Sequence, residues 1–394
     1  MADVAVRTTP WWVRVLAVFV ASRVVTTALL LWFASKQGAN AWTDPQPGYF
    51  DFARIWDAHW YFIIAVSGYP SVLPVTDTGA IGENAWAFMP GYPSLVRALM
   101  LVTGVDFPVV GVLVSVAFAA GTSLLLYRLF EKALGPGTAL FSVVLFCVAP
   151  LSPIYQVAYA ESMHTFFLVL ALLLLQNRQY WLMIPVIAVM ALTRPSGLAF
   201  ALALLLHLGY RWWKDPDFPW RERIAVMVVG LFSAFMGIVW LLAAWYVTGS
   251  PSAYTDTELA WRAGYGFTGE LVPFEPWMLG AQFWLQFPAG PLIVGTGILF
   301  IVGFLWLVVV SRGARRIGVD TRFWLVSYLL YLLAVFFPQS STFRLLVPLF
   351  PVLGIVAQPK SPLYRVGIVI VFIIGQYLWL QATWLVDGSD WTPP

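Results

Sequence analysis

The stretch LIVGTGILFIVGFLWLVVV, residues 292–310, decides the fold class of this chain because it has no charged residue and is long enough to cross a bilayer. The 394-residue chain is 60% hydrophobic and only 10% charged, which is more apolar surface than a compact soluble domain buries. Unbroken apolar runs, among them residues 166–175, exclude the alternating strands of an outer-membrane barrel. The sequence therefore predicts an all-α polytopic membrane protein.

Residues 11–33 form the first predicted span, and this run is too long for the apolar region of a cleaved signal peptide. Arg7 and Arg14 at its start favour a cytoplasmic N-terminus. All clusters of Lys and Arg fall on the cytoplasmic side if there are about eleven spans in all. The further spans are residues 109–126, 137–157, 162–175, 181–192, 196–208, 224–247, 291–310, 323–337, 345–357 and 366–385.

This topology makes one transmembrane domain in a cell membrane, residues 1–394. It has two long external loops, residues 34–108 and 248–290, and its C-terminus is external. Residues 86–104 are apolar, but their prolines and Arg97 predict a shorter helix that lies at the membrane interface or dips into it.

The alternative is that residues 86–104 span the membrane. Arg128, Lys132 and Arg178 would then lie outside, unless residues 181–208 crossed only once. The first topology needs no such adjustment, and we prefer it.

The segment FARIWDAHWYFIIAVSGYP, residues 52–70, sets a single acid, Asp57, among aromatic side chains shortly after the first span. A carboxylate near lipid is costly unless it has a function or a partner. One interpretation is a solvated loop with aromatic rings at the headgroup level. The other is a functional site, and the polar residues on the same side of the membrane favour it.

The predicted topology brings several polar residues to the outer ends of the spans. They are Asp57, His59, Glu161, His164, Arg194 and Arg344. Unpaired charges at this depth are expensive, so Glu161 and an arginine can simply pair and hold helices together. Arginine also presents a fork of donors that suits phosphate, and Gln339 and the hydroxyls just before Arg344 add further donors.

An external carboxylate that faces arginines, with no nucleophilic Ser or Cys beside it, predicts group transfer from a lipid-linked phosphate. The carboxylate is the expected general base, and arginine the expected phosphate ligand. No metal or other cofactor is expected, because no acid stands at a D-x-D spacing from Asp57 and the three His residues do not cluster. The single cysteine, Cys147, allows no internal disulfide.

Five short motifs resemble, in order, those of the PIG-V-like mannosyltransferases, which are relatives of the second mannosyltransferase of GPI-anchor synthesis. WDAHWYFIIAVSGYP (56–70) is similar to the family's WDxxW[FY]xxIAxxGY, and FMPGYP (88–93) to its FFPx[FY]P. YAES (159–162) is similar to YSE, TRPSG (193–197) to TRSNG, and FRLLVPLFP (343–351) to R[FY]xLVxxP. Pro195 and Ser196 depart from the family's Ser-Asn, which puts a polar role at that spot in doubt.

The resemblance implies a GT-C glycosyltransferase fold with juxtamembrane helices in the first external loop. It also implies an inverting, metal-independent enzyme of glycolipid biosynthesis in the cell envelope, which moves mannose from a polyprenyl-phosphate-mannose donor on the exoplasmic face. The acceptor would be a glycolipid or lipoglycan, such as a phosphatidylinositol mannoside. The expected partners are membrane lipids and no nucleic acid; whether the chain has a small membrane subunit, as some relatives do, stays open.

The expected roles follow from chemistry and resemblance together. Asp57 is the expected general base. Arg344, Arg194 and His59 are candidates for the donor phosphate. Trp56, Trp60, Tyr61, Glu161 and His164 are candidates for the sugar or acceptor.

Some alternatives remain open at this point. His59 can instead cap its loop, and the aromatic residues can anchor the interface. Residues 248–290 are either a cover over the acceptor or an amphipathic surface segment. A transporter or flippase for a lipid-linked sugar is the rival function, and glucose, arabinose or a phospho-group are the rival transferred groups, since only the resemblance selects mannose.

Overall fold

The structure is a computed structural model of the chain, and it describes residues 9–263, 265–266, 271–386 and 392–394. Arg7, one of the two basic residues used to orient the N-terminus, lies outside the described residues. The described residues form helices and no named strand, with one isolated antiparallel bridge between Val75 and Ile81. The predicted all-α class is confirmed.

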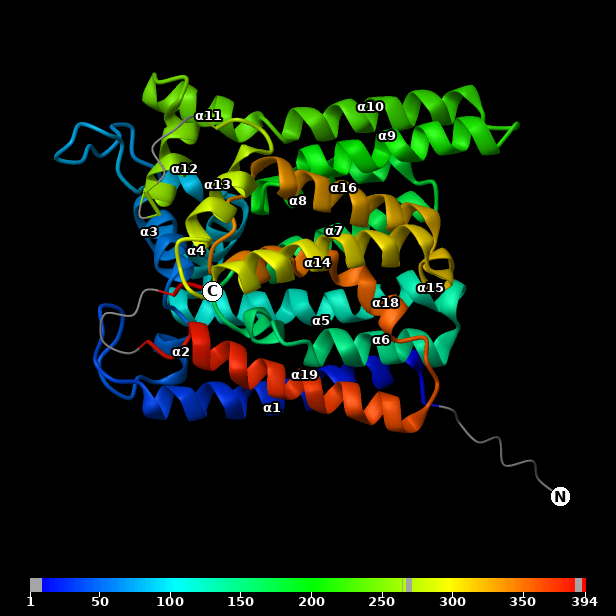
Figure 1. Cartoon of the computed structure of the whole chain (residues 1–394), viewed down its shortest axis with the longest axis horizontal. Coiled ribbons are helices and arrows are strands. Elements are labelled where there is room, and N and C mark those ends of the chain that lie inside the picture. Colours follow the sequence, from blue (N-terminus) through cyan, green and yellow to red (C-terminus); the bar gives the residue numbers. More distant parts are fainter. Residues whose placement is uncertain (1–8, 264, 267–270, 387–391) are drawn as a thin grey trace.

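Five apolar helical stretches are long enough to cross a membrane. They are α1 (Trp11–Lys36), α5 (Phe107–Leu134), α10 with α11 (Trp220–Met236 and Val239–Thr248), α14 (Gly290–Val310) and α19 (Pro362–Thr383). Each coincides with a predicted span. Figure 1 shows most of them running along the long axis of the molecule.

The other predicted spans correspond to shorter elements. These are α6 (Pro136–Val148), α7 (Glu161–Gln176), α8 (Met183–Thr193), α9 (Gly197–Lys214), α16 (Val319–Val335), η4 (Val347–Val352) and α18 (Leu353–Val356). The predicted span 137–157 is divided, because α6 ends before Pro150 and residues Ser152–Gln156 form the separate 3-10 turn η2. The predicted span 345–357 is likewise irregular around Pro348 and Pro351. The count of about eleven spans stays a prediction.

The remaining elements are short connections between the long helices. They are α2 (Tyr49–Phe52), α3 (Asp57–Ser67), η1 (Ala85–Ala87), α4 (Gly91–Thr103), η3 (Tyr180–Leu182), α12 (Ala253–Ala263), α13 (Glu275–Trp284), α15 (Arg312–Arg316) and α17 (Thr342–Leu345). Figure 1 shows α2, α3, α4, α12 and α13 together at one end and α15 at the other. Residues 86–104 thus hold a short helix, α4, as the prolines predicted.

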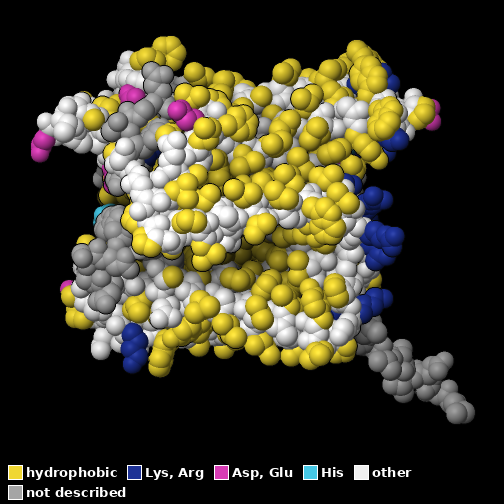
Figure 2. Space-filling model, viewed as in Figure 1, with side chains coloured by type: hydrophobic (Ala, Val, Ile, Leu, Met, Phe, Trp, Pro, Cys, Tyr) yellow, Lys and Arg dark blue, Asp and Glu magenta, His cyan; other side chains and the backbone are white. Residues whose placement is uncertain are grey.

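The predicted cytoplasmic loops meet at the α15 end of the molecule. Lys132 lies 3.4 Å from Asn177, and Arg178 lies 3.9 Å from Asp215. The Gln358 amide donates to the carbonyl of Gly313 at 2.8 Å. Figure 2 shows most of the visible Lys and Arg side chains gathered at this end. On the face that Figure 2 shows, basic side chains therefore gather at the α15 end of the molecule.

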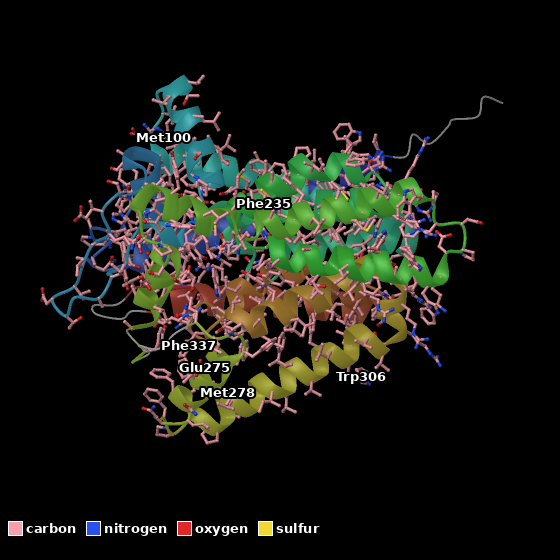
Figure 3. All side chains as sticks on the ribbon, turned by 90° about the horizontal axis from the view of Figure 1, so that it is seen from above. Met100, Phe235, Glu275, Met278, Trp306 and Phe337 are labelled. Atoms are coloured by element: carbon pink, nitrogen blue, oxygen red, sulfur yellow. The ribbon has the colours of Figure 1, made fainter. Side chains whose placement is uncertain are left out.

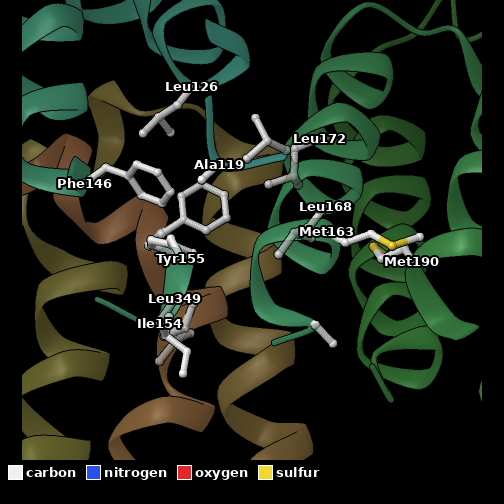
Figure 4. Packing of buried hydrophobic residues seen from close by; sticks show 14 of the residues in the cluster. Ala119, Leu126, Phe146, Ile154, Tyr155, Met163, Leu168, Leu172, Met190 and Leu349 are labelled. Carbon is white, nitrogen blue, oxygen red and sulfur yellow. The ribbon is translucent and has the colours of Figure 1, made fainter. Parts of the chain in front are cut away.

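The buried core lies between α5, α6, α7 and α8. Figure 4 shows Phe146 and Tyr155 facing each other inside it, and their ring centroids are 4.7 Å apart. Gly121 permits close packing, because a Cβ atom there would lie 2.7 Å from the Phe166 ring. Close helix approach through small residues is typical of helices packed within a bilayer.

Helix α14 packs against the rest of the molecule mainly near its C-terminal end. Phe304 and Val308 are buried there, whereas Leu292, Leu299 and Trp306 are more than half exposed. In Figure 3, α14 stands apart from the other helices toward its α13 end. An apolar surface of this extent is typical of a helix that faces lipid.

Candidate active site

Asp57 is the first residue of α3, and an unusual backbone conformation at Trp56 puts it there. Trp56 has φ 60° and ψ −127°, a region that costs a residue with a side chain about 1–3 kcal/mol. The buried indole Nε1 donates to the carbonyl of Thr383 at 2.9 Å and so anchors the strained residue. The N-terminus of a helix also favours a negative charge. The local structure therefore holds the Asp57 carboxylate at a defined point.

Arg344 pairs directly with Asp57. Arg344 Nη1 donates to Asp57 Oδ2, and both side chains are largely buried. The Tyr159 ring lies under the guanidinium at 5.6 Å, and its hydroxyl accepts from the backbone N–H of Asp57 at 3.1 Å. Tyr159 thus contacts both members of the ion pair.

Glu161 lies behind two arginines. Its Oε1 is 3.0 Å from Arg194 Nη1 and 3.7 Å from Arg344 Nε, and the residue is only 2% exposed. Burial works against the charge of Arg344, but Asp57 and then Glu161 outweigh it and raise the pKa of Arg344 above its ordinary value. Two carboxylates and two guanidinium groups therefore form one buried, charge-balanced cluster.

The cluster opens into a cavity of about 430 Å³. Asp57, Tyr61, His164, Arg194 and Arg344 all line it. Of the six polar residues that the predicted topology groups at one side of the membrane, the structure brings Asp57, His164, Arg194 and Arg344 to this cavity. Ordered hydroxyl and guanidinium groups beside a carboxylate can bind and orient an anionic, hydroxyl-bearing substrate.

Tyr61 and His164 have polar contacts within the cavity wall. Arg194 Nη1 donates to the Tyr61 hydroxyl at 3.4 Å. His164 Nε2 lies 3.0 Å from Ser196 Oγ, and that hydroxyl donates to the carbonyl of Arg194 at 3.1 Å. His164 and Ser196 therefore share a side-chain hydrogen bond next to Arg194. Ser196, the position that departs from the PIG-V-like motif, thus has a polar contact beside Arg194.

Described residues of segment 248–290, which was predicted as the second external loop, line one part of the cavity. Arg262 of α12 donates to the carbonyl of Val335 at 2.7 Å, and Trp277 of α13 donates to that of Leu332 at 3.0 Å. Trp284 donates in the same way to Pro338 at 3.0 Å. These bonds fasten α12 and α13 to the end of α16, near the labelled Phe337 in Figure 3. These contacts favour the interpretation of residues 248–290 as a cover of the cavity rather than as an amphipathic surface segment.

Four residues predicted for the site do not line the cavity. Trp56 is anchored on Thr383 and packs on Trp42 at 5.5 Å. His59 also packs on Trp42, at 5.4 Å, and burial with the nearby Arg54 lowers its pKa. The structure does not bring His59 to the two arginines.

Trp60 and Glu161 are the other two. Trp60 stacks on Phe88 at 5.8 Å and packs edge-on against Trp261 at 5.5 Å, and both of these residues line the cavity. Glu161 contacts the arginines from behind, so its placement favours the pairing interpretation over contact with a sugar.

Sequence reasoning missed the part played by Tyr159 and left the role of α12 open. Tyr159 enters the sequence analysis only as the first residue of the YAES motif, although a phenol two residues before Glu161 was a visible signal. The polar stripe Tyr254, Glu258 and Arg262, spaced by four residues, was visible in the sequence and lines the cavity.

Among the residues described, no group of three or more His, Cys, Asp or Glu side chains is arranged to hold a metal ion. The metal-independent reaction stays a prediction. A scan against protein-family models and a search of curated proteins each found no match to the chain.

Proposed function

We propose that this protein is an integral-membrane inverting glycosyltransferase that moves mannose from a polyprenyl-phosphate-mannose donor to a glycolipid or lipoglycan acceptor. The observation that carries the proposal is the pairing of Asp57 with Arg344 on the wall of a cavity that Arg194 also lines. A carboxylate beside two guanidinium groups suits a reaction that takes up a proton and releases a phosphate.

Asp57 is the general base in this proposal. It accepts the proton of the acceptor hydroxyl while that oxygen attacks the anomeric carbon of the donor sugar. The bond between that carbon and the phosphate oxygen breaks, and its electron pair leaves with the polyprenyl phosphate. Attack from the face opposite the phosphate inverts the configuration, so a β-linked donor gives an α-linked product.

The arginines receive the phosphate. Arg344 donates to Asp57 through Nη1 while its Nε faces Glu161 at 3.7 Å, so the outer end of the guanidinium, with Nη1 and Nη2, is the part that meets a phosphate oxygen in the cavity. Arg194 lines the same cavity. Glu161 limits the movement of both side chains through its contacts at 3.0 and 3.7 Å. Binding of the phosphate draws Arg344 from Asp57 and leaves the carboxylate free for the acceptor proton.

The cavity faces the exoplasmic side in this proposal, with the N-terminus in the cytoplasm. The support is the gathering of Lys and Arg at the opposite, α15 end of the molecule, because cytoplasmic loops carry the excess of positive charge. A lipid-linked monophosphate is the donor type expected on that side.

The choice of mannose and of a GT-C fold rests on the five motifs that resemble the PIG-V-like family. Four of them contribute a member of the buried cluster: Asp57 comes from the first, Glu161 from the third and Arg344 from the last. The fourth contributes Arg194.

A donor panel tests the proposal. Purified protein in liposomes is given one polyprenyl phosphate carrying labelled mannose, glucose or arabinose, with membrane glycolipids as acceptors. The proposal predicts label in a new glycolipid with mannose only, and no added metal should be needed. Movement of intact donor across the bilayer without a new product would indicate a flippase, and label from another sugar would change the substrate.

A further inference from the structure

Helix α12 has a polar stripe that the transfer chemistry does not use. Tyr254, Glu258 and Arg262 follow one another at intervals of four residues and so share one face of the helix. All three line the cavity, together with Trp261. Asp57 and Arg344 line the same cavity. The cavity thus has a second polar region besides the transfer cluster.

Helix α12 is firmly held by its other contacts. Thr257 is fully buried, and Asn84 Nδ2 donates to its hydroxyl at 2.8 Å. Ala253 packs in a small cluster with Trp86 and Trp240. Anchoring on one face presents the neighbouring stripe to the cavity in a fixed orientation, as a binding surface requires.

Two donors on this stripe have no partner within the described part of the chain. Arg262 is about nine-tenths buried and uses Nη2 for the carbonyl of Val335, but its Nη1 makes no hydrogen bond there. The Trp261 Nε1 is likewise buried without a hydrogen bond to the described residues. A buried donor without a partner costs about 1–3 kcal/mol, so these groups are expected to have a ligand.

The charge of the stripe favours a neutral ligand. Glu258 balances Arg262, and burial raises the pKa of the Glu258 carboxyl despite the opposing effect of Arg262. An anionic phosphate would meet Glu258 at close range, whereas hydroxyl groups can donate to its carboxylate and accept from Arg262. The Trp261 and Tyr254 rings can pack on the apolar face of a sugar or cyclitol ring.

We propose that Glu258 and Arg262 bind the ring hydroxyls of a polyol headgroup on the acceptor, with Tyr254 and Trp261 packing on the ring. This inference rests on the proposed function, because it divides one cavity between a donor phosphate at Arg344 and an acceptor ring at α12. It narrows the acceptor to a lipid whose headgroup is a sugar or an inositol, and it makes α12 the element that selects this acceptor.

Direct binding tests the inference without requiring transfer. The purified full-length protein in detergent micelles is titrated with methyl α-mannoside and with myo-inositol, and saturation-transfer-difference NMR measures binding. We expect binding of at least one polyol by the wild type, weakened about tenfold or more in Glu258→Gln and in Arg262→Gln. Asp256→Asn is the matched control, since Asp256 lies on the same helix, bonds to Ser252 and does not line the cavity.

The Asp57→Asn variant separates this inference from the proposed function. Polyol binding should persist in that variant even where transfer is lost. Tyr254→Phe gives a second test if Glu258→Gln does not extract as a monodisperse protein. This variant keeps the aromatic ring, so it should weaken polyol binding less than Glu258→Gln does. Binding that is equal in the wild type and in the α12 variants, or no binding of either polyol by the wild type, contradicts the inference.

Steady-state kinetics show whether the ring that binds at α12 belongs to the acceptor or to the donor sugar. With polyprenyl-phosphate-mannose and a phosphatidylinositol-based acceptor, Glu258→Gln should raise the KM for the acceptor about tenfold and leave the KM for the donor unchanged. A raised KM for the donor alone would assign α12 to the donor sugar and overturn the inference.

Discussion

Arg344 reaches across 287 positions of the chain to donate a hydrogen bond to Asp57 at the wall of the cavity. The two residues come from α17 and from the start of α3, and neither element is longer than a few turns. The Tyr159 ring packs against the guanidinium of Arg344, and Glu161 Oε1 lies 3.7 Å from Arg344 Nε. Most of the predictions below concern this arrangement.

Replacing Arg344 by Ala removes the partner of a largely buried carboxylate. We expect the free energy of unfolding to fall by about 3–5 kcal/mol, the typical cost of leaving a buried charge unpaired. Arg344→Lys should retain more stability but raise the KM for the donor, because an ammonium cannot form the two-pronged contact with phosphate. Thermal unfolding and donor titration measure the two effects.

Arg365→Lys is the control for this series, since Arg365 donates to the carbonyl of Pro359, outside the cavity. That variant should resemble the wild type in both measurements. A normal donor dependence in Arg344→Lys and Arg344→Ala would remove Arg344 from the phosphate role.

Glu161→Gln should disturb both arginines at once, because one carboxylate lies against Arg194 and Arg344. Loss of its charge leaves two buried cations with only Asp57 for balance, so the melting temperature and the affinity for the donor should both fall. Glu131→Gln is the matched control: its pair with Arg128 is at the surface, and such pairs contribute about 0–1 kcal/mol. Equal melting temperatures for the two variants would show that Glu161 does not position the arginines.

Gly91→Ala should destabilise the site through packing. A Cβ atom at residue 91 would lie 2.8 Å from the Leu192 carbonyl oxygen and 2.8 Å from Thr193 Oγ1, just before Arg194. The backbone must shift, so both thermal stability and transfer should decrease. Gly209→Ala, within α9 and with open space around its Cβ position, should be neutral or stabilising by about 1 kcal/mol. Similar melting temperatures for the two variants would contradict this packing.

His59 should make stability depend on pH. Burial and then Arg54 lower its pKa below 6.5, so the folded protein favours the neutral ring. Below about pH 6.5 the unfolded chain binds more protons at this site than the folded chain, and stability is lost as the pH falls toward the folded pKa. The melting temperature of the wild type should therefore drop more between pH 7 and about pH 5 than that of His59→Phe. Parallel pH profiles would exclude this contribution.

The sequence predicted the long helices well, because an uninterrupted apolar run has few other stable structures in a bilayer. It predicted the irregular segments poorly. Residues 137–157 and 345–357 have no charged residue, yet Pro150, Pro348 and Pro351 interrupt their helices. Hydropathy alone hides such interruptions, whereas the prolines themselves were visible signals.

The sequence predicted which residues belong to the site better than it predicted which of them contact one another. Side-of-membrane reasoning grouped Asp57, Arg194 and Arg344, because the charge distribution between loops constrains which ends lie together. It did not indicate that Arg344 would pair with Asp57, whereas the pairing of Glu161 with an arginine was one of its two interpretations. Such partners are selected by tertiary packing over long sequence separations, and no local pattern records them.

The most direct test of the account is mannosyl transfer from labelled polyprenyl-phosphate-mannose by Asp57→Asn and wild-type protein at equal amounts in the same liposomes. The amide keeps the shape of the carboxylate but cannot take up the acceptor proton, so transfer should fall about a hundredfold or more. The variant should still elute as a monodisperse species. Equal transfer by the two proteins would contradict the role of Asp57 as the general base, and with it the central claim.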